Sequence, residues 1–262
     1  MRISYFQVNA FTSSPFGGNP AGVCVLGDWL PDELLQKIAA ENNLSETAFF
    51  TREEDHFHLR WMTPAVEVDL CGHATLATAH VIFSELGEAK ERLWFRTRSG
   101  RVSAARRGEM IELDFPSRPP VPCAAPDLLT AALRRTPMKV LKSRDYVAVF
   151  ATEADVATLQ PEMALVSQLD SLGLIVTAPG TQCDFVSRFF APQVGVPEDP
   201  VTGSAHSTLV PYWAGRLGKS ELCAKQISWR GGDLYCRLAG DRVGIAGRAI
   251  TYSRGELHLP YP

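Results

Sequence analysis

Two short segments combine glycine, small polar residues and titratable side chains in a way that suits a bound carboxylate. One runs from Asp69 to Thr75 and the other from Glu198 to Ala205. In each, Gly72 or Gly203 stands where a loop enters an apolar run, and glycine lets a ligand approach the bare backbone. A helix start also exposes unpaired N–H groups and a partial positive charge. Two such starts facing one cleft would clamp a carboxylate, although the same glycines could simply form tight turns under buried helices.

Glu46 is the candidate general acid and base. It directly precedes the apolar run Thr47-Ala48-Phe49-Phe50. A carboxylate at the edge of a partly apolar site has its pKa raised toward neutrality. Proton transfer by a positioned group of this kind contributes roughly 10²–10⁴ in rate. The alternative is that Glu46 is a surface residue that caps the strand.

Three more polar residues accompany these segments. Asp199 could bind an amine or hold His73 in one tautomer, or could only cap its turn. His73 lies at a helix start, where a charged ring is disfavoured, so we expect a neutral, hydrogen-bonding ring or an ordinary core histidine. Asn19 belongs to a glycine-rich stretch, residues 17–22, that lacks the lysine of a P-loop. We expect a tight turn there, in which Asn19 touches substrate or has only a structural part.

The elements that position these residues form a diverged tandem repeat. Phe57–Pro64 and Phe185–Pro192 share phenylalanine, arginine, an aromatic residue and proline at identical internal spacing. The offset is 188 − 60 = 128 at the arginines and 203 − 72 = 131 at the glycines, so the second connecting loop is three residues longer. Each copy reads as a strand, a proline-containing loop and an apolar helix.

Both predicted helices are apolar on nearly every face and should be buried. The first spans His73–Leu86, and Gly87 is placed to end it. The second spans Ser204–Leu217 and contains Pro211, so we expect it to be bent or shortened. Further strand candidates surround them: Ile3–Ala10, Gly22–Leu26, Leu93–Thr97, Val102–Arg106, Met110–Phe115, Tyr146–Phe150, Leu172–Thr177, Gln226–Trp229, Leu234–Leu238 and Arg242–Ala246. Amphipathic helices fit Asp32–Glu41 and Asp127–Arg135.

Length and composition favour two small units in one globular chain. The 262 residues divide best into residues 1–117 and 118–262, the last of which can cross back to the first unit, with the proline-rich stretch 116–126 as linker. The net charge of −3 argues against nucleic acid as a partner. We expect no membrane span, no metal, since Cys/His ligand spacing is absent, and six free thiols in a cytoplasmic protein.

The ordered motifs resemble the phenazine-biosynthesis-like (PhzF-like) isomerase family within the diaminopimelate epimerase fold. They are Val8–Phe11, Gly18–Gly22, Ser45–Phe49, Thr63–Val68, Cys71–Thr75 and Glu198–Ala205. The resemblance implies an α+β fold of two pseudo-symmetric halves, each a mostly antiparallel strand barrel around a central buried helix. It also implies a cofactor-free enzyme, a substrate held between the halves, and a homodimer.

The resemblance also implies roles for individual residues. Glu46 would shuttle the proton, His73 and Asp199 would contact the substrate, and backbone groups of Gly72, Gly203 and Ser204 would bind its polar groups. Related epimerases use two opposed cysteines. Cys71 matches the first, whereas Thr202 stands at the second, and a threonine hydroxyl is a poor base near neutral pH.

Three hypotheses follow for this chain. The first is an isomerase that moves a proton on a small, amino-acid-like carboxylate through Glu46. The second is a racemase or epimerase in which Cys71 acts as one base. The third is a non-catalytic ligand-binding protein on an enzyme fold, since fold alone does not fix function.

Overall fold

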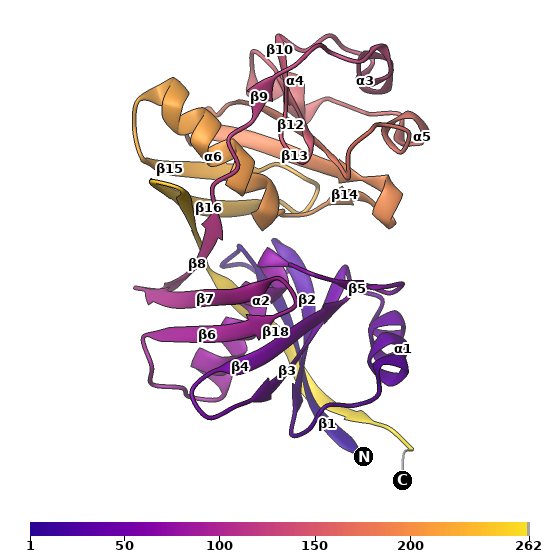
Figure 1. Cartoon of the computed structure of the whole chain (residues 1–262), viewed down its shortest axis with the longest axis vertical. Helices are drawn as coiled ribbons and strands as arrows, with labels where there is room; N and C mark the ends of the chain where they lie inside the picture. Colours follow the sequence, from indigo (N-terminus) through magenta and orange to yellow (C-terminus); the bar gives the residue numbers. More distant parts are fainter. Residues whose placement is uncertain (261–262) are drawn as a thin grey trace. The chain divides into compact units, whose positions relative to one another are not determined.

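The computed structural model describes residues 1–260, and the chain forms two compact units (Figure 1). Unit 1 comprises Met1–Asp114 together with the described residues from Ala246 onward, and unit 2 comprises Phe115–Ile245. The return to unit 1 is made by β18 (Ala249–His258), which pairs antiparallel with β1 (Arg2–Ala10). The first and the last described strands therefore belong to the same unit.

Unit 1 is a curved, mixed sheet wrapped around a buried helix. The strands neighbour one another in the order β18-β1-β2-β3-β4-β6-β7-β8, with β2–β3 and β4–β6 parallel and the other pairs antiparallel. Their bounds are β2 (Asn19–Leu26), β3 (Glu46–Arg52), β4 (Phe57–Met62), β6 (Arg92–Thr97), β7 (Gly100–Arg107) and β8 (Met110–Pro116), and β5 (Glu67–Val68) pairs with β4. The helix α1 (Asp32–Asn42) joins β2 to β3.

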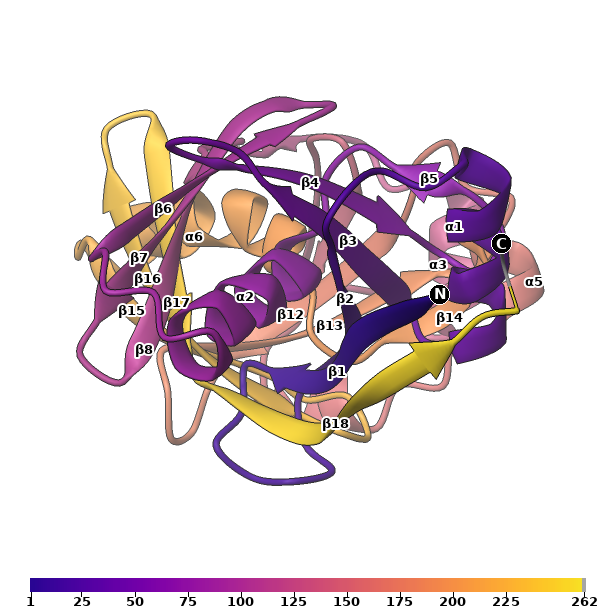
Figure 2. The same cartoon turned by 90° about the horizontal axis from the view of Figure 1, so that it is seen from below.

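The helix α2 (Gly72–His80) lies inside this sheet, where its first eight residues are buried. It packs against β1, β2, β3, β7 and β18, and the strands of unit 1 surround it when seen from below (Figure 2). The sequence predicted one α-helix to Leu86. Instead, a π-helical turn, η1 (Val81–Glu85), follows His80, and the Leu86 N–H donates to the Val81 carbonyl at 3.0 Å.

Unit 2 repeats the same succession of strand pairs. β11–β12 is parallel, β12–β13 antiparallel, β13–β15 parallel and β15–β16 antiparallel, as in β2-β3-β4-β6-β7. The strands are β9 (Val121–Pro122), β10 (Lys139–Lys142), β11 (Tyr146–Val149), β12 (Leu174–Pro179), β13 (Phe185–Ala191), β14 (Val196–Asp199), β15 (Glu221–Gln226), β16 (Gly232–Ala239) and β17 (Arg242–Gly247). The helices are α3 (Asp127–Leu133), α4 (Glu153–Ala157), α5 (Met163–Val166), η2 (Pro192–Val194) and α6 (Gly203–Leu217). The tandem repeat read from the sequence is therefore present in the fold.

Pro211 was expected to bend or shorten the second helix, and α6 is not shortened, because it runs from Gly203 to Leu217 through the proline. Proline has no N–H to give to the carbonyl four residues earlier, which belongs to Ser207. That carbonyl accepts the N–H of Arg118 at 2.9 Å instead. The hydrogen bond lost inside the helix is thus replaced by one from the first residues of unit 2.

Two local predictions were wrong. Asn19 lies at the start of β2 and not within a turn that continues to Gly22; the turn is confined to the residues before it. The predicted strand Gln226–Trp229 is a loop, because β15 ends at Gln226 and the Gln226 side chain turns to the backbone before α6. The second of these differences bears on the candidate site of unit 2.

Candidate active site

Asn19, Glu46 and His73 come together in unit 1 because two parallel strands begin beside the start of α2. Asn19 opens β2 and Glu46 opens β3, where Glu46 pairs with Ala21 of β2. Gly18 makes this approach possible: its φ is +64°, and a Cβ there would lie 2.2 Å from the Ala10 carbonyl oxygen. Only glycine fits such a position without strain.

His73 is the centre of this group. Its Nδ1 lies 3.2 Å from the Asn19 Nδ2 and 3.5 Å from the Cys71 Sγ, and its Nε2 lies 3.2 Å from the Glu46 Oε2. The amide nitrogen of Asn19 can only donate, so Nδ1 must accept, and the ring hydrogen then resides on Nε2. That hydrogen is on the side of the Glu46 carboxylate, although Nε2 and Oε2 do not form a hydrogen bond with each other.

The His73 ring is neutral near physiological pH. Burial lowers its pKa to about 3, since a charged ring would have to lose its water. The contact between His73 and Glu46 is therefore one between a neutral N–H and a carboxyl group, and not an ion pair. Glu46 keeps a side chain that is 16% exposed, so a small molecule can reach it. This is the environment expected for a carboxyl group that exchanges protons.

Glu46, Cys71 and His73 also offer a set of possible metal ligands within 4.8 Å of one another. The thiol, however, faces Nδ1 of the ring, whereas the carboxylate faces Nε2. One ion cannot bind both nitrogens of the same ring, so the histidine would have to turn before all three residues could share an ion. The observed geometry suits proton transfer better than metal binding.

The predicted residues of unit 2 gather at the start of α6. Asp199 ends β14, Thr202 is the residue before the helix, and Gly203 and Ser204 are its first two residues. Thr202 precedes α6 as Cys71 precedes α2. Neither side chain forms a capping hydrogen bond with the first turn of its helix. The Arg144 guanidinium lies 3.4 Å from the Ser204 hydroxyl. Both helix starts therefore keep the character of an anion-binding site.

Gln226 was missed by the sequence analysis. It is fully buried, and it bonds the backbone on both sides of the turn between Asp199 and Thr202. A buried glutamine has no signature in a single sequence. The register of β13 with β15, which places Gln226 beside Ser187, is what identifies it.

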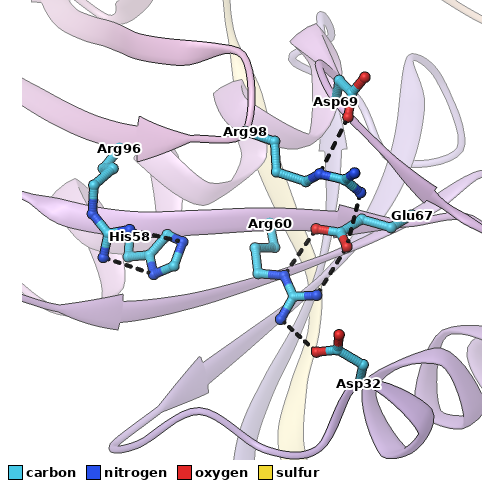
Figure 3. Close-up of polar contacts among 7 residues, drawn as sticks. All are labelled: Asp32, His58, Arg60, Glu67, Asp69, Arg96 and Arg98. Atoms are coloured by element: carbon cyan, nitrogen blue, oxygen red, sulfur yellow. Dashed lines mark hydrogen bonds and ion pairs between the residues drawn. The ribbon is translucent and has the colours of Figure 1, made fainter.

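Two arginine–glutamate pairs were also missed, one in each unit. Arg60 on β4 binds Glu67 through two hydrogen bonds of 2.8 and 2.9 Å, with Asp32 and Arg98 alongside (Figure 3). Arg188 on β13 binds Glu198 in the same way, at 2.7 and 2.9 Å. Each pair fixes the segment that leads to the buried helix. The signal was available, because the arginines recur at the same place in the two copies and a glutamate follows each.

The chain is similar to known proteins over nearly its whole length. The family model described as phenazine biosynthesis-like protein matches residues 8–255. A Pseudomonas aeruginosa protein named as an uncharacterized isomerase is 53% identical over 259 residues, which cover 99% of this chain and 100% of that protein. The crystal structure of a PhzF-family phenazine biosynthesis protein from Enterococcus faecalis matches with a TM-score of 0.97 at 45% identity, covering 99% of this chain and 100% of the other.

A more distant match extends the fold alone. A predicted epimerase from Pseudomonas aeruginosa has a TM-score of 0.75 at 18% identity, over 97% of this chain and 99% of the other. The expected α+β, epimerase-like fold is therefore confirmed. None of the helices within residues 1–260 is both long and apolar enough to span a membrane. On the family match and the close relatives, the chain belongs to the phenazine biosynthesis-like family of isomerases.

Proposed function

We propose that this protein is a cofactor-independent isomerase that moves a proton on a small, amino-acid-like carboxylic acid. The carboxyl group of Glu46 removes a proton from a carbon next to the substrate carboxylate. The electron pair of that C–H bond moves into the adjacent unsaturated system. Glu46 then returns the proton to another carbon, so the substrate is rearranged without gain or loss of atoms or electrons.

The observation that carries this proposal is the arrangement of Asn19, His73 and Glu46. Asn19 favours one tautomer of a neutral ring, and the ring places Nε2, which then carries the hydrogen, 3.2 Å from the Glu46 Oε2. Such an N–H can hydrogen-bond the anionic carboxylate, or the negative charge that develops on the substrate, without carrying a charge itself. The role of His73 is therefore to stabilise charge, while Glu46 transfers the proton.

The remaining predicted residues would bind the substrate. Backbone N–H groups of Gly72, Gly203 and Ser204 belong to the first turns of α2 and α6, which attract anions and suit a carboxylate. Asp199 carries the negative charge that would recognise the substrate amine. This division supports a substrate with both an acidic and a basic group.

The experiment is a screen of small amino acids and hydroxy acids in deuterated water, read by NMR as deuterium bound to carbon. We expect the wild-type protein to label at least one amino acid, and Glu46→Gln to fold and bind it while its exchange rate falls about 10³-fold. Glu41→Gln, an exposed glutamate on α1, is the matched control and should keep full exchange. Full activity in Glu46→Gln would refute the proposed role, and binding by calorimetry without exchange in the wild type would favour a non-catalytic ligand-binding protein.

A racemase that uses Cys71 is the second candidate, favoured by the 3.5 Å contact between the Cys71 thiol and His73. It differs in its product, because a racemase would place deuterium on the α-carbon and form the opposite enantiomer. It also differs in its sensitivity to alkylation of Cys71. Chiral chromatography of the labelled product separates the two reactions.

A further inference from the structure

The turn that carries Asp199 forms three hydrogen bonds with one buried side chain, that of Gln226. Gln226 Oε1 accepts the N–H of Thr202 at 2.8 Å, and Gln226 Nε2 donates to the Asp199 carbonyl at 2.8 Å and to the Thr202 hydroxyl oxygen at 3.2 Å. The Ser228 hydroxyl, two residues on, donates to the Pro200 carbonyl at 2.7 Å. The end of β15 thus fixes the backbone from Asp199 to Thr202.

The direction of these hydrogen bonds is determined by the chemistry of an amide. Nε2 of Gln226 can only donate, so the Thr202 hydroxyl must accept from it. The hydroxyl hydrogen is then directed to the Oδ2 of Asp199, to which Thr202 donates a short hydrogen bond. If Oδ2 were protonated, its hydrogen would face the hydroxyl hydrogen of Thr202. The chain of donors from Gln226 through Thr202 therefore favours Asp199 in its charged form.

Unit 1 shows that the repeated fold does not need this arrangement. The parallel pairs β4–β6 and β13–β15 place Thr97 at the position of Gln226, because both residues end their strands. Thr97 donates to the Gly100 carbonyl of its own hairpin at 2.7 Å. Gln226 therefore serves the turn before α6 and not the sheet as such.

We propose that Gln226 and Thr202 are positioning residues that hold Asp199 as a charged acceptor, so that the protein selects substrates with an ammonium group over their deaminated counterparts. This inference rests on the proposed function, in which Asp199 recognises the substrate amine. Neither residue transfers a proton to the substrate. They act through the charge and orientation of Asp199.

The test compares Thr202→Val with Thr202→Ser. Valine has the shape of threonine and lacks the hydroxyl, whereas serine keeps it. The probes are the amino acid that the wild type labels fastest in deuterated water and the hydroxy acid of the same skeleton. We expect Thr202→Val to lower the ratio of kcat/KM for the amino acid over the hydroxy acid about 10-fold, and Thr202→Ser to stay within about 3-fold of the wild type. Gln226→Leu should behave as Thr202→Val does.

A second measurement follows the relay without turnover. In protein labelled with ¹³C at aspartate carboxyl carbons, the Asp199 signal should titrate about one pH unit higher in Thr202→Val than in Thr202→Ser, because a hydrogen bond to the charged form is lost. Equal titrations and equal ratios in the two variants would overturn the inference. If the wild type labels no probe, the proposed function fails on this panel, while the titration still decides whether the relay exists.

Discussion

The two units present different chemistry from the same strand order. In unit 1, Cys71 precedes the buried helix, and His73 accepts at Nδ1 and carries its hydrogen on Nε2. In unit 2, Thr202 stands at the position of Cys71, and the Thr202 carbonyl accepts a hydrogen bond from Nδ1 of His206 at 2.8 Å, so this ring holds the opposite tautomer. The comparison shows that unit 1 has a thiol and a histidine beside its buried helix, whereas unit 2 has the Asp199 carboxylate, held by the Thr202 hydroxyl.

This asymmetry argues against a mechanism with two equivalent bases. A two-thiol racemase needs a thiol at both positions, and unit 2 offers a threonine whose hydroxyl already donates to Asp199. At the start of α6, the described carboxylate is that of Asp199, which accepts a hydrogen bond from Thr202 and does not face a histidine ring as Glu46 does. The environment of Glu46 suits a single base in unit 1, whereas Asp199 in unit 2 is a carboxylate acceptor held by Thr202.

The largest effect should come from reversing the tautomer of His73. Asn19→Asp keeps the size of the side chain, but its carboxylate accepts where the amide donated, so the hydrogen moves to Nδ1 and a bare Nε2 faces Glu46. A catalytic histidine in the wrong tautomer loses several powers of ten in rate, and we expect kcat for exchange to fall about 10³-fold. Activity close to that of the wild type would remove the tautomer argument. Steady-state exchange kinetics with unfolding curves would separate this effect from misfolding.

The arginine–glutamate pairs test whether the same interaction stabilises the two units equally. Arg188→Met should lower the free energy of unfolding by about 3 kcal/mol, because it leaves a half-buried Glu198 and the carbonyls of Val156 and Leu159 without this donor. Arg60→Met should cost less, about 1–2 kcal/mol, because Arg98 lies 3.2 Å from Glu67 and remains. Urea unfolding of both variants gives the order, and an equal loss would contradict it.

How much of this could be predicted from the sequence depends on the kind of signal. The repeated strand motifs and the two apolar helices fixed the architecture, because apolar periodicity is a local property of the chain. The gathering of Asn19, Glu46 and His73 depends on the parallel pairing of β2 with β3, which no local pattern specifies. The sequence predicts that Gln226 begins a strand, whereas it ends β15, and the hydrogen bonds of its amide to the Asp199–Thr202 turn depend on the register of β15 with β13. The roles of these residues stay predictions.

The buried histidines should make the protein less stable in mild acid. Burial lowers the pKa of His206 to about 4, whereas an unfolded chain takes up the proton near its ordinary value of about 6.5. The unfolded state therefore binds more protons between these values, so stability is fully present above about pH 6.5 and declines as the pH falls toward 4. From one histidine, the loss at pH 5 relative to pH 7 is about 2 kcal/mol.

His206→Gln tests this contribution, because glutamine can still donate to the Thr202 carbonyl but does not titrate. We expect the difference in unfolding free energy between pH 7 and pH 5 to shrink by about 2 kcal/mol in the variant. His73 in unit 1 contributes with the same sign, since its pKa is also lowered by burial, so part of the wild-type dependence should persist. An unchanged difference would mean that His206 is accessible to water.

The smallest change in unfolding free energy should come from Pro211. This proline lies inside α6, whereas α2 contains no proline. Replacing an interior helix proline by alanine normally stabilises a helix by about 3 kcal/mol, because a hydrogen bond is restored and a clash removed. Here the Ser207 carbonyl already accepts the N–H of Arg118. An alanine N–H would compete for a satisfied acceptor, and the unfolded chain would gain freedom, so Pro211→Ala should change the unfolding free energy by less than about 1 kcal/mol. Gly215→Ala in the same helix is the control, because open space surrounds it and it should gain about 0.5–1 kcal/mol. A gain near 3 kcal/mol for Pro211→Ala would show that α6 is strained at the proline after all.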